Sequence, residues 1–226
     1  MSMSKVIEIA RGELGVTENP PGSNRVKYWN DYDPAYQGQP WCVSFLWWVF
    51  QQAGERMAFF GGGKTASCGT LLRWYMEQGL MYSASEVQVG DIVILNFHGG
   101  KDTEHCGLVK KVIRMTATGE VFQIDTIEGN TSSAGSQDNG GMVCEKVRYP
   151  HQIVGVCRPQ YKPEEPQPVD DITGHLAASS IEWAKEKGLI KGYPDGSFQP
   201  DKPLTRAEMC AILERFYALL WEDDMR

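Results

Sequence analysis

Two residues that can carry out nucleophilic chemistry together, a cysteine and a histidine, stand at informative places in the sequence. Cys42 lies near the front of the apolar run QPWCVSFLWWVF, and His105 lies in the segment TEHCGLV. A cysteine nucleophile needs a lowered thiol pKa, a base within hydrogen-bonding reach, and a third group that orients the base. This pair of residues therefore raises the hypothesis of covalent catalysis.

The predicted elements place both residues well for this role. Cys42 opens a predicted helix over 41–53, where free N–H groups and the helix dipole favour a thiolate, and Pro40 suits a helix entry. His105 begins a predicted strand, a rigid position that is open to a cleft. The other three histidines, His98, His151 and His175, lie in predicted loops or in the second part of the chain.

Polar residues at the end of the next predicted strand supply the third group. Glu128 and Asn130 alternate to one face of that strand, so a paired neighbour would bring both near His105. One could fix the imidazole tautomer, and the other could orient the ring or the substrate. The alternative is a buried core thiol at Cys42 and a structural histidine at His105.

Helical patterns precede strand patterns in the first 160 residues. The predicted helices cover 4–14, 41–53 and 71–78, and the predicted strands cover 92–96, 107–115, 121–128 and 153–158. This order predicts an α+β fold with an antiparallel sheet.

A proline-rich and acidic segment, residues 161–169, predicts a stiff linker between a domain at 1–160 and a smaller one at 170–226. The smaller domain shows two helical patterns joined by a turn at Gly192–Gly196. Thr205 and Glu208 form the capping box of the second helix, which predicts a small all-α module.

The bulk composition excludes several classes of function. The net charge is −7 without a dense cluster of cations, which argues against nucleic acid and anionic membrane surfaces as partners. No apolar run is long enough to span a membrane, and the N-terminus does not resemble a signal peptide, so we expect synthesis and folding in the cytoplasm. None of the six cysteines forms a CxxC pair, so we expect buried thiols and no metal or other cofactor.

The first 160 residues resemble the CHAP family of cysteine, histidine-dependent amidohydrolases and peptidases. The resemblance covers Glu13–Glu18, Gly22–Asn24, Lys27–Tyr28, Pro40–Cys42 with Trp47 and Trp48, Gly90–Val93, His105–Val109 and Ile127–Thr131. Members usually have a small residue after the cysteine and a β-branched one after the histidine, where this chain has Val43 and Cys106.

The resemblance implies a papain-like fold and hydrolysis of an amide bond in peptidoglycan, by an N-acetylmuramoyl-L-alanine amidase or an endopeptidase. Cys42 would be the nucleophile, His105 the general base, Glu128 the group that orients His105, and Asn130 a fourth polar member. An oxyanion would be held by the Cys42 N–H and by Gln39. Trp41 is the aromatic residue that we expect in a sugar-binding groove.

Asp31 and Asp33 raise the question of calcium, because some CHAP domains bind it with a DxD loop ahead of the cysteine. Calcium requires six to eight oxygen ligands, and Ser44 and Glu55 are the nearest candidates that follow. We expect a solvated, turn-forming acidic loop and keep calcium as the alternative.

The second domain resembles an S-layer homology (SLH) module, on the residues Asp171-Ile172, Gly174-His175, Trp183-Ala184, Lys191–Gly196 and Leu204–Met209. The resemblance implies binding of a secondary cell-wall polysaccharide, with Arg206 as a carboxylate-binding fork. A surface salt bridge is the alternative role of Arg206. Such modules usually occur in threes, so a single module suggests a homotrimer held by the apolar tail 216–221.

Together the two resemblances imply a wall hydrolase of the endolysin type, which stays in the host cytoplasm until the membrane is permeabilised and then acts on the cell wall. A host autolysin or wall-remodelling hydrolase is the second hypothesis. A catalytically dead wall-binding protein is the third, and the presence of Cys42, His105 and Glu128 argues against it.

Overall fold

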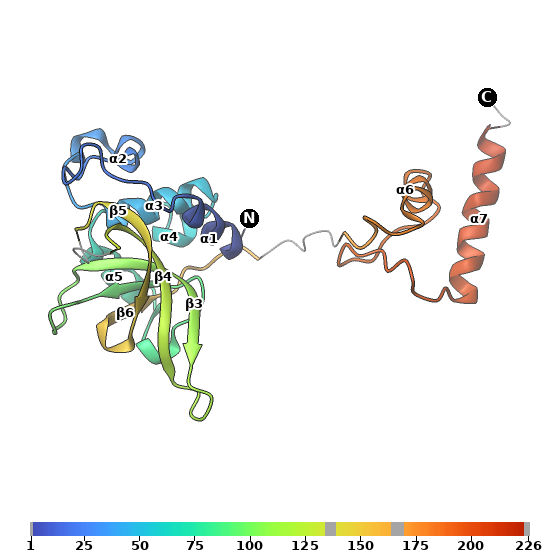
Figure 1. Cartoon of the computed structure of the whole chain (residues 1–226). Helices are drawn as coiled ribbons and strands as arrows, with labels where there is room; N and C mark the ends of the chain where they lie inside the picture. The colour runs from blue at the N-terminus through green and yellow to red at the C-terminus, as the bar shows by residue number, and fades with distance from the viewer. Residues whose placement is uncertain (1, 134–138, 164–169, 224–226) are drawn as a thin grey trace. The chain divides into compact units, whose positions relative to one another are not determined.

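A computed structural model of the chain describes residues 2–133, 139–163 and 170–223, with side chains in the last helix as far as residue 220. Two compact units are present, Met1–Glu164 and Glu165–Arg226 (Figure 1). Within the described residues no helix is both long and apolar enough to cross a membrane.

The first unit is built on a six-stranded antiparallel sheet in the order β1-β6-β2-β3-β4-β5. The strands are β1 (Met81–Tyr82), β2 (Ile92–Leu95), β3 (His105–Arg114), β4 (Val121–Thr131), β5 (Met142–Arg148) and β6 (Ile153–Cys157). The α+β prediction with an antiparallel sheet is therefore confirmed. Strand β5, which pairs with β4, was not predicted, although its register decides which side chains meet below.

The described residues of this unit form five helices, which gather on one face of the sheet in Figure 1. They are α1 (Met3–Gly12), α2 (Lys27–Tyr32), α3 (Cys42–Gln52), α4 (Arg56–Phe60) and α5 (Cys68–Glu77). Short 3₁₀ turns lie at Pro34–Tyr36, Ala84–Glu86 and Pro150–Gln152.

Alternation along the strands divides the apolar side chains between two cores. Ile92 and Ile94 of β2 and Leu108 of β3 pack beneath the helices, whereas Val93 and Leu95 of β2 pack in a smaller cluster on the other face. Helix α3 lies in the larger core, with Phe45, Leu46, Val49 and Phe50 fully buried. The apolar run of the sequence thus anchors the helix that begins at Cys42.

The chain stays attached to the first unit beyond residue 160, where the linker was predicted to begin. Tyr161 stacks on Phe50, with ring centroids 5.7 Å apart, and its hydroxyl donates a hydrogen bond to the Gly90 carbonyl. The Lys162 N–H donates to the Glu55 carboxylate. Tyr161 thus joins the core, because its ring finds an apolar neighbour; the remainder of the predicted linker, 164–169, lies outside the described residues.

The second unit contains α6 (Ala178–Glu186) and α7 (Arg206–Asp223). The predicted capping box is present, since Glu208 N–H donates to Thr205 Oγ1 and Thr205 N–H donates to the Glu208 carboxylate. Asp171 accepts the N–H groups of Phe198 and Gln199 and so fixes the segment between the helices. The apolar residues that this unit buries include Ile181, Ala184 and Leu189.

Candidate active site

Cys42 is the first residue of α3 and is 5% exposed. Trp41 occupies the N-cap position, and no side chain caps the helix. A helix N-terminus directs unpaired N–H groups and a partial positive charge outward, so the Cys42 sulfur lies in a field that favours its thiolate form.

His105 is the first residue of β3, and its imidazole meets a carboxylate of β4. The His105 Nε2–H donates a hydrogen bond of 3.1 Å to Glu128 Oε2, and neither side chain is exposed. Gly107 leaves the room for this pair, because a Cβ atom there would lie 2.7 Å from Glu128 Cγ. The absence of a side chain at residue 107 therefore lets Glu128 reach the histidine.

Glu128 is held from its other side by Arg148, the last residue of β5. The guanidinium donates from Nε to Glu128 Oε1 at 2.8 Å and from Nη2 to Glu128 Oε2 at 2.5 Å. The Thr126 hydroxyl donates to Oε1 at 2.6 Å. Sequence reasoning missed Arg148; a buried arginine needs a carboxylate partner, but only the pairing of β4 with β5 reveals which one.

The electrostatics of this group follow from its contacts. Burial opposes ionisation of Glu128, but the hydrogen bonds from Arg148 and His105 outweigh it and lower its pKa to about 2. Burial also favours a neutral His105, but contacts with Cys42 and Glu128 outweigh it and raise its pKa to about 9. The imidazole is therefore charged at neutral pH.

The second ring nitrogen of His105 is the one available to Cys42. Nδ1 is buried and has no hydrogen-bond partner among the described residues, while Nε2 is engaged by Glu128. Contact with the Cys42 thiol contributes to the raised pKa of His105. The contacts thus run from the Cys42 sulfur through the His105 imidazole to the Glu128 carboxylate and the Arg148 guanidinium.

Two further cysteines surround the Cys42 sulfur. Hydrogen bonding from Cys106 and Cys68 lowers the pKa of Cys42 well below its usual value against the effect of burial, and His105 acts in the same direction. Burial raises the pKa of Cys106. The Cys106 thiol stabilises a Cys68 thiolate, but the Cys42 thiol and burial outweigh this and raise the pKa of Cys68. Of the three thiols, Cys42 is therefore the one whose pKa is lowered.

Asn130 does not join this chain as the strand alternation suggested. Its backbone has a φ of 59°, and the register between β4 and β5 shifts between Glu128 and Thr131. Its side-chain amide donates to Asn139 at 3.2 Å rather than to His105. The regular alternation of strand side chains ends at this irregularity, so shared direction with Glu128 cannot be inferred there.

Trp41 is buried, so the prediction that it lines a groove is wrong. It has no exposed surface, its indole N–H donates to Glu18 at 2.9 Å, and its ring lies 5.4 Å from that of Tyr28. The indole packs inward because the carboxylate of Glu18 satisfies its N–H within the core.

Gln39 is exposed, and it borders a hollow of about 570 Å³ beside the start of α3. The residues that line this hollow include Trp29, Tyr36, Pro40, Lys64 and Ser67. Pro40 lies two residues before α3 and Ser67 one residue before α5, so this hollow lies beside the helix ends that carry Cys42 and Cys68. It is the candidate groove for a substrate.

The calcium candidates both have partners in the structure. Asp31 accepts the indole N–H of Trp48 at 2.7 Å, and Asp33 accepts the N–H of Ala35 at 3.0 Å in the following 3₁₀ turn. Both carboxylates thus act in the local structure of this loop.

In the second unit Arg206 is exposed, and no hydrogen bond or ion pair is found for it within the described part of the chain. A hollow of about 380 Å³ in the same unit is lined by residues that lie near Arg206 in the sequence. Its lining includes the cations Lys191, Lys202 and Arg215 and the ring of Tyr193. Lys191 and Tyr193 belong to the motif on which the resemblance rests, whereas Lys202 and Arg215 were not singled out from the sequence.

Comparison with known proteins identifies two domain families. Residues 34–130 match the family model of the CHAP domain, and residues 170–210 match that of the S-layer homology domain. A crystal structure of Ly7917 aligns with 70% of this chain and 63% of its own, at 17% identity and a TM-score of 0.42.

Curated relatives share a short segment with this chain. Cell surface glycoprotein 1 of Acetivibrio thermocellus is 42% identical over 57 residues, 25% of this chain and 2% of that protein. The Cellulosome-anchoring protein of the same organism is 48% identical over 42 residues, 19% of this chain and 9% of that protein. The chain thus spans a small fraction of these relatives. Along the chain, the segment that matches the CHAP domain model is followed by the segment that matches the S-layer homology domain model.

Proposed function

We propose that the chain is a peptidoglycan hydrolase that uses Cys42 as its nucleophile and associates with the cell wall through its second unit. The observation that carries this proposal is the buried chain of Cys42, His105, Glu128 and Arg148. A thiolate beside an imidazolium, oriented by a paired carboxylate, is the arrangement that nucleophilic attack on an amide requires.

The reaction is acyl transfer in two steps. The Cys42 thiolate attacks the amide carbonyl, and a bond forms between sulfur and carbon. The carbon–nitrogen bond breaks as His105 gives its Nδ1 proton to the leaving amine. Neutral His105 then takes a proton from water, the hydroxyl attacks the thioester, and the carboxylic acid and the thiolate are released.

The tetrahedral intermediate needs donors for its oxyanion. The Cys42 N–H at the uncapped start of α3 is one, and the exposed Gln39 amide at the edge of the groove is the second. Glu128, held by Arg148, keeps Nε2 engaged and so presents Nδ1 to the sulfur.

A clearing assay on purified cell walls tests the nucleophile. Cys42→Ala should abolish clearing, whereas Cys144→Ala, a half-buried cysteine on β5, should retain it. Equal clearing by wild type and Cys42→Ala would refute the assignment. Absence of clearing by wild-type protein on walls of several chemotypes would instead support a dead wall-binding protein.

The bond is that of an N-acetylmuramoyl-L-alanine amidase or of a stem or cross-bridge endopeptidase. Mass spectrometry of the soluble wall fragments separates the two. A free lactyl carboxyl on muramic acid identifies the amidase, and a new peptide terminus identifies the endopeptidase.

For the second unit we propose binding to an acidic secondary wall polysaccharide. The support is the exposed guanidinium of Arg206 together with the hollow lined by Lys191, Lys202 and Arg215. Inactive Cys42→Ala protein should sediment with intact walls and not with walls stripped of the polysaccharide. Arg206→Ala should weaken sedimentation more than Arg206→Lys; equal binding by all three proteins would remove Arg206 from the site.

We also propose that three chains associate through the second unit. Exposed apolar residues on α7 support this, among them Leu213, Phe216 and Leu220, each at least 40% exposed. Trp221, which was included in the predicted apolar contact, has no described side chain. Light scattering at micromolar concentration should give three times the chain mass, and a monomer would contradict the proposal.

The biological setting that we propose is an endolysin rather than a host autolysin. An endolysin made in the cytoplasm should lyse its host only after the membrane is permeabilised. Expression with and without a membrane-permeabilising protein tests this. Wall turnover without permeabilisation would favour the autolysin.

A further inference from the structure

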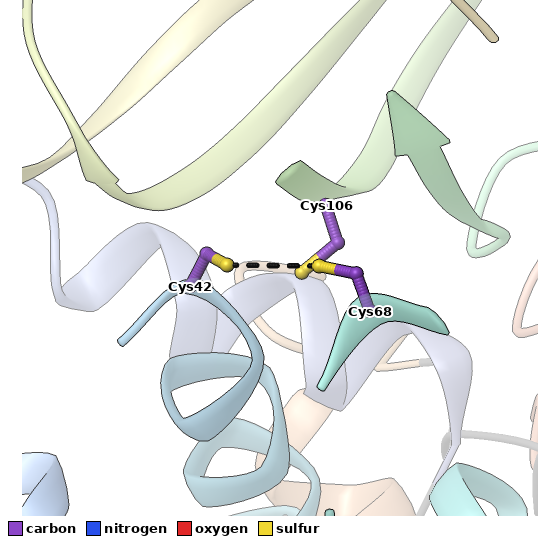
Figure 2. A group of neighbouring side chains, drawn as sticks. All are labelled: Cys42, Cys68 and Cys106. Atoms are coloured by element: carbon purple, nitrogen blue, oxygen red, sulfur yellow. Dashed lines mark hydrogen bonds between the residues drawn. The ribbon is translucent and has the colours of Figure 1, made fainter. Parts of the chain in front are cut away.

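Three buried sulfur atoms from separate elements meet at the start of α3. Cys42 begins α3, Cys68 begins α5, and Cys106 is the second residue of β3 (Figure 2). All three side chains point toward one another, and their sulfur atoms lie within 4.8 Å of each other. Amide hydrolysis by Cys42 with His105 does not require the other two thiols.

The spacing of these atoms suits a metal ion with sulfur ligands. Zinc bonds to thiolate sulfur at about 2.3 Å in a tetrahedral arrangement, which separates any two of its sulfur ligands by about 3.8 Å. Cys42 Sγ and Cys68 Sγ are 3.8 Å apart, and the third sulfur lies within reach of both. Small side-chain rotations are therefore enough to surround one ion.

The anchoring elements make the site rigid and selective. Cys42 and Cys68 are each fixed at the head of a helix, and Cys106 is fixed in the sheet, where it has no exposed surface. Sulfur ligands favour soft or borderline ions and discriminate against calcium and magnesium. Three sulfurs leave one tetrahedral position, which a water molecule can fill.

The charges around the cluster favour a cation. Three crowded thiols cannot all lose their protons together, since each thiolate repels the next. A divalent ion takes the place of the thiol protons, which pass to the buffer, and the three sulfurs with the ion then carry one net negative charge.

We propose that Cys42, Cys68 and Cys106 form a zinc-binding site that holds the enzyme inactive until the ion is removed. Coordination to zinc uses a lone pair of the Cys42 sulfur and withdraws negative charge from that sulfur, so the loaded protein does not begin acyl transfer. The inhibitory consequence rests on Cys42 being the nucleophile; the binding of the ion does not.

Cobalt(II) titration of the reduced, full-length chain tests the site without measuring activity. A phosphine reductant keeps the thiols free without supplying a competing one. We expect one cobalt ion per chain, a thiolate-to-cobalt charge-transfer band, and loss of that band when zinc is added. No such band in the wild-type protein would overturn the proposal, whatever the variants do.

Variants assign the ligands. Cys68→Ala and Cys106→Val should each weaken cobalt binding by at least ~10-fold, the lower end for disturbing a metal site. The matched controls Cys144→Ser and Cys210→Ser remove thiols outside the cluster and should bind as the wild type does. The assignment would be overturned if the controls lost as much cobalt affinity as the cluster variants, or if no variant lost any.

A clearing assay then tests inhibition. Zinc should stop clearing by the wild type, a chelator should restore it, and Cys68→Ala should need at least ~10-fold more zinc relative to its own metal-free rate. A cobalt band together with full clearing by Cys42→Ala would retain the metal site and reject the nucleophile. Loss of clearing in Cys42→Ala without any cobalt band would do the reverse.

Discussion

The histidine–carboxylate pair of the candidate site and that of the second unit differ in their exposure to water. In the first unit the side chains of His105 and Glu128 are fully buried, and that of Arg148 is 3% exposed. In the second unit His175 lies 3.3 Å from Asp201, and their side chains are 27% and 92% exposed. A buried pair keeps its geometry and charge without solvent screening, whereas an exposed pair contributes little. The difference indicates that the buried pair can hold the charges that the proposed chemistry needs.

The apolar residues show the opposite contrast. Fully buried aromatic side chains such as Trp29, Trp41 and Tyr75 fill the first unit. In the second unit Leu176 is fully exposed, and Trp183 and Tyr217 are 48% and 63% exposed. A unit of this size buries little surface, so such residues are available to a partner surface. These exposed residues are the ones on which the proposed association through the second unit rests.

The largest effect that would test this contrast comes from Arg148→Ala. It leaves the buried Glu128 carboxylate without its guanidinium partner, which should cost about 3–5 kcal/mol of stability. Asp201→Ala, the matched change in the second unit, should leave stability unchanged. Urea unfolding of the full chain measures the free energy of unfolding of both variants. A loss below about 1 kcal/mol for Arg148→Ala would contradict the prediction, because it would mean that water can solvate the Glu128 carboxylate in place of the guanidinium.

Association through α7 should respond next most strongly. Leu213→Lys places a charge on the exposed apolar face and should remove about 1.5–3 kcal/mol per chain from a trimer contact. Glu214→Lys, at the neighbouring position, is the control. Light scattering should show dissociation for Leu213→Lys alone, and a trimer that survives this substitution would place the contact elsewhere.

The pH dependence of clearing reports the ionisation of His105 in the candidate site. The pKa of His105 is raised above 6.5 to about 9, so its imidazolium persists through neutral pH, and activity should fall as pH rises through about 9. Glu128→Gln removes the negative charge that stabilises the imidazolium, so the fall in activity should begin about one pH unit lower. His175→Gln should leave the pH dependence of clearing unchanged. If Glu128→Gln also leaves it unchanged, Glu128 does not influence the group whose titration limits activity.

Helix caps give the smallest expected effects, one in each unit. Ser67 accepts the N–H of Thr70 at the start of α5, and Thr205 accepts that of Glu208 at the start of α7. Ser67→Ala and Thr205→Ala should each cost about 1 kcal/mol. Calorimetry should assign the two losses to different transitions; a shared transition would show that the units unfold together.

The elements that position the candidate site could be predicted from local patterns, because these depend on nearby residues. The apolar period and Pro40 place Cys42 at a helix start, and the β-branched run places His105 at the start of β3. Glu128 could be proposed as its neighbour because adjacent strands commonly pair. The chemical roles of these residues stay predictions until activity is measured.

Long-range contacts could not be predicted in the same way. Arg148 reaches Glu128 only through the pairing of β5 with β4, and Cys68 reaches Cys42 only through the packing of two helix ends. Asn130 leaves the regular alternation because its backbone turns to a positive φ, and Trp41 turns inward because Glu18 accepts its N–H. Each of these depends on a partner far away in the sequence.

The contacts of Tyr161 and Lys162 have a practical consequence for protein engineering. Because these residues fasten the end of the first unit to Phe50, Gly90 and Glu55, a fusion joint placed after residue 160 would strip an aromatic ring from the core. A joint placed after residue 163 leaves every one of these contacts intact. A fusion that joins the first unit to another wall-binding module should therefore keep Tyr161 and Lys162 with the first unit.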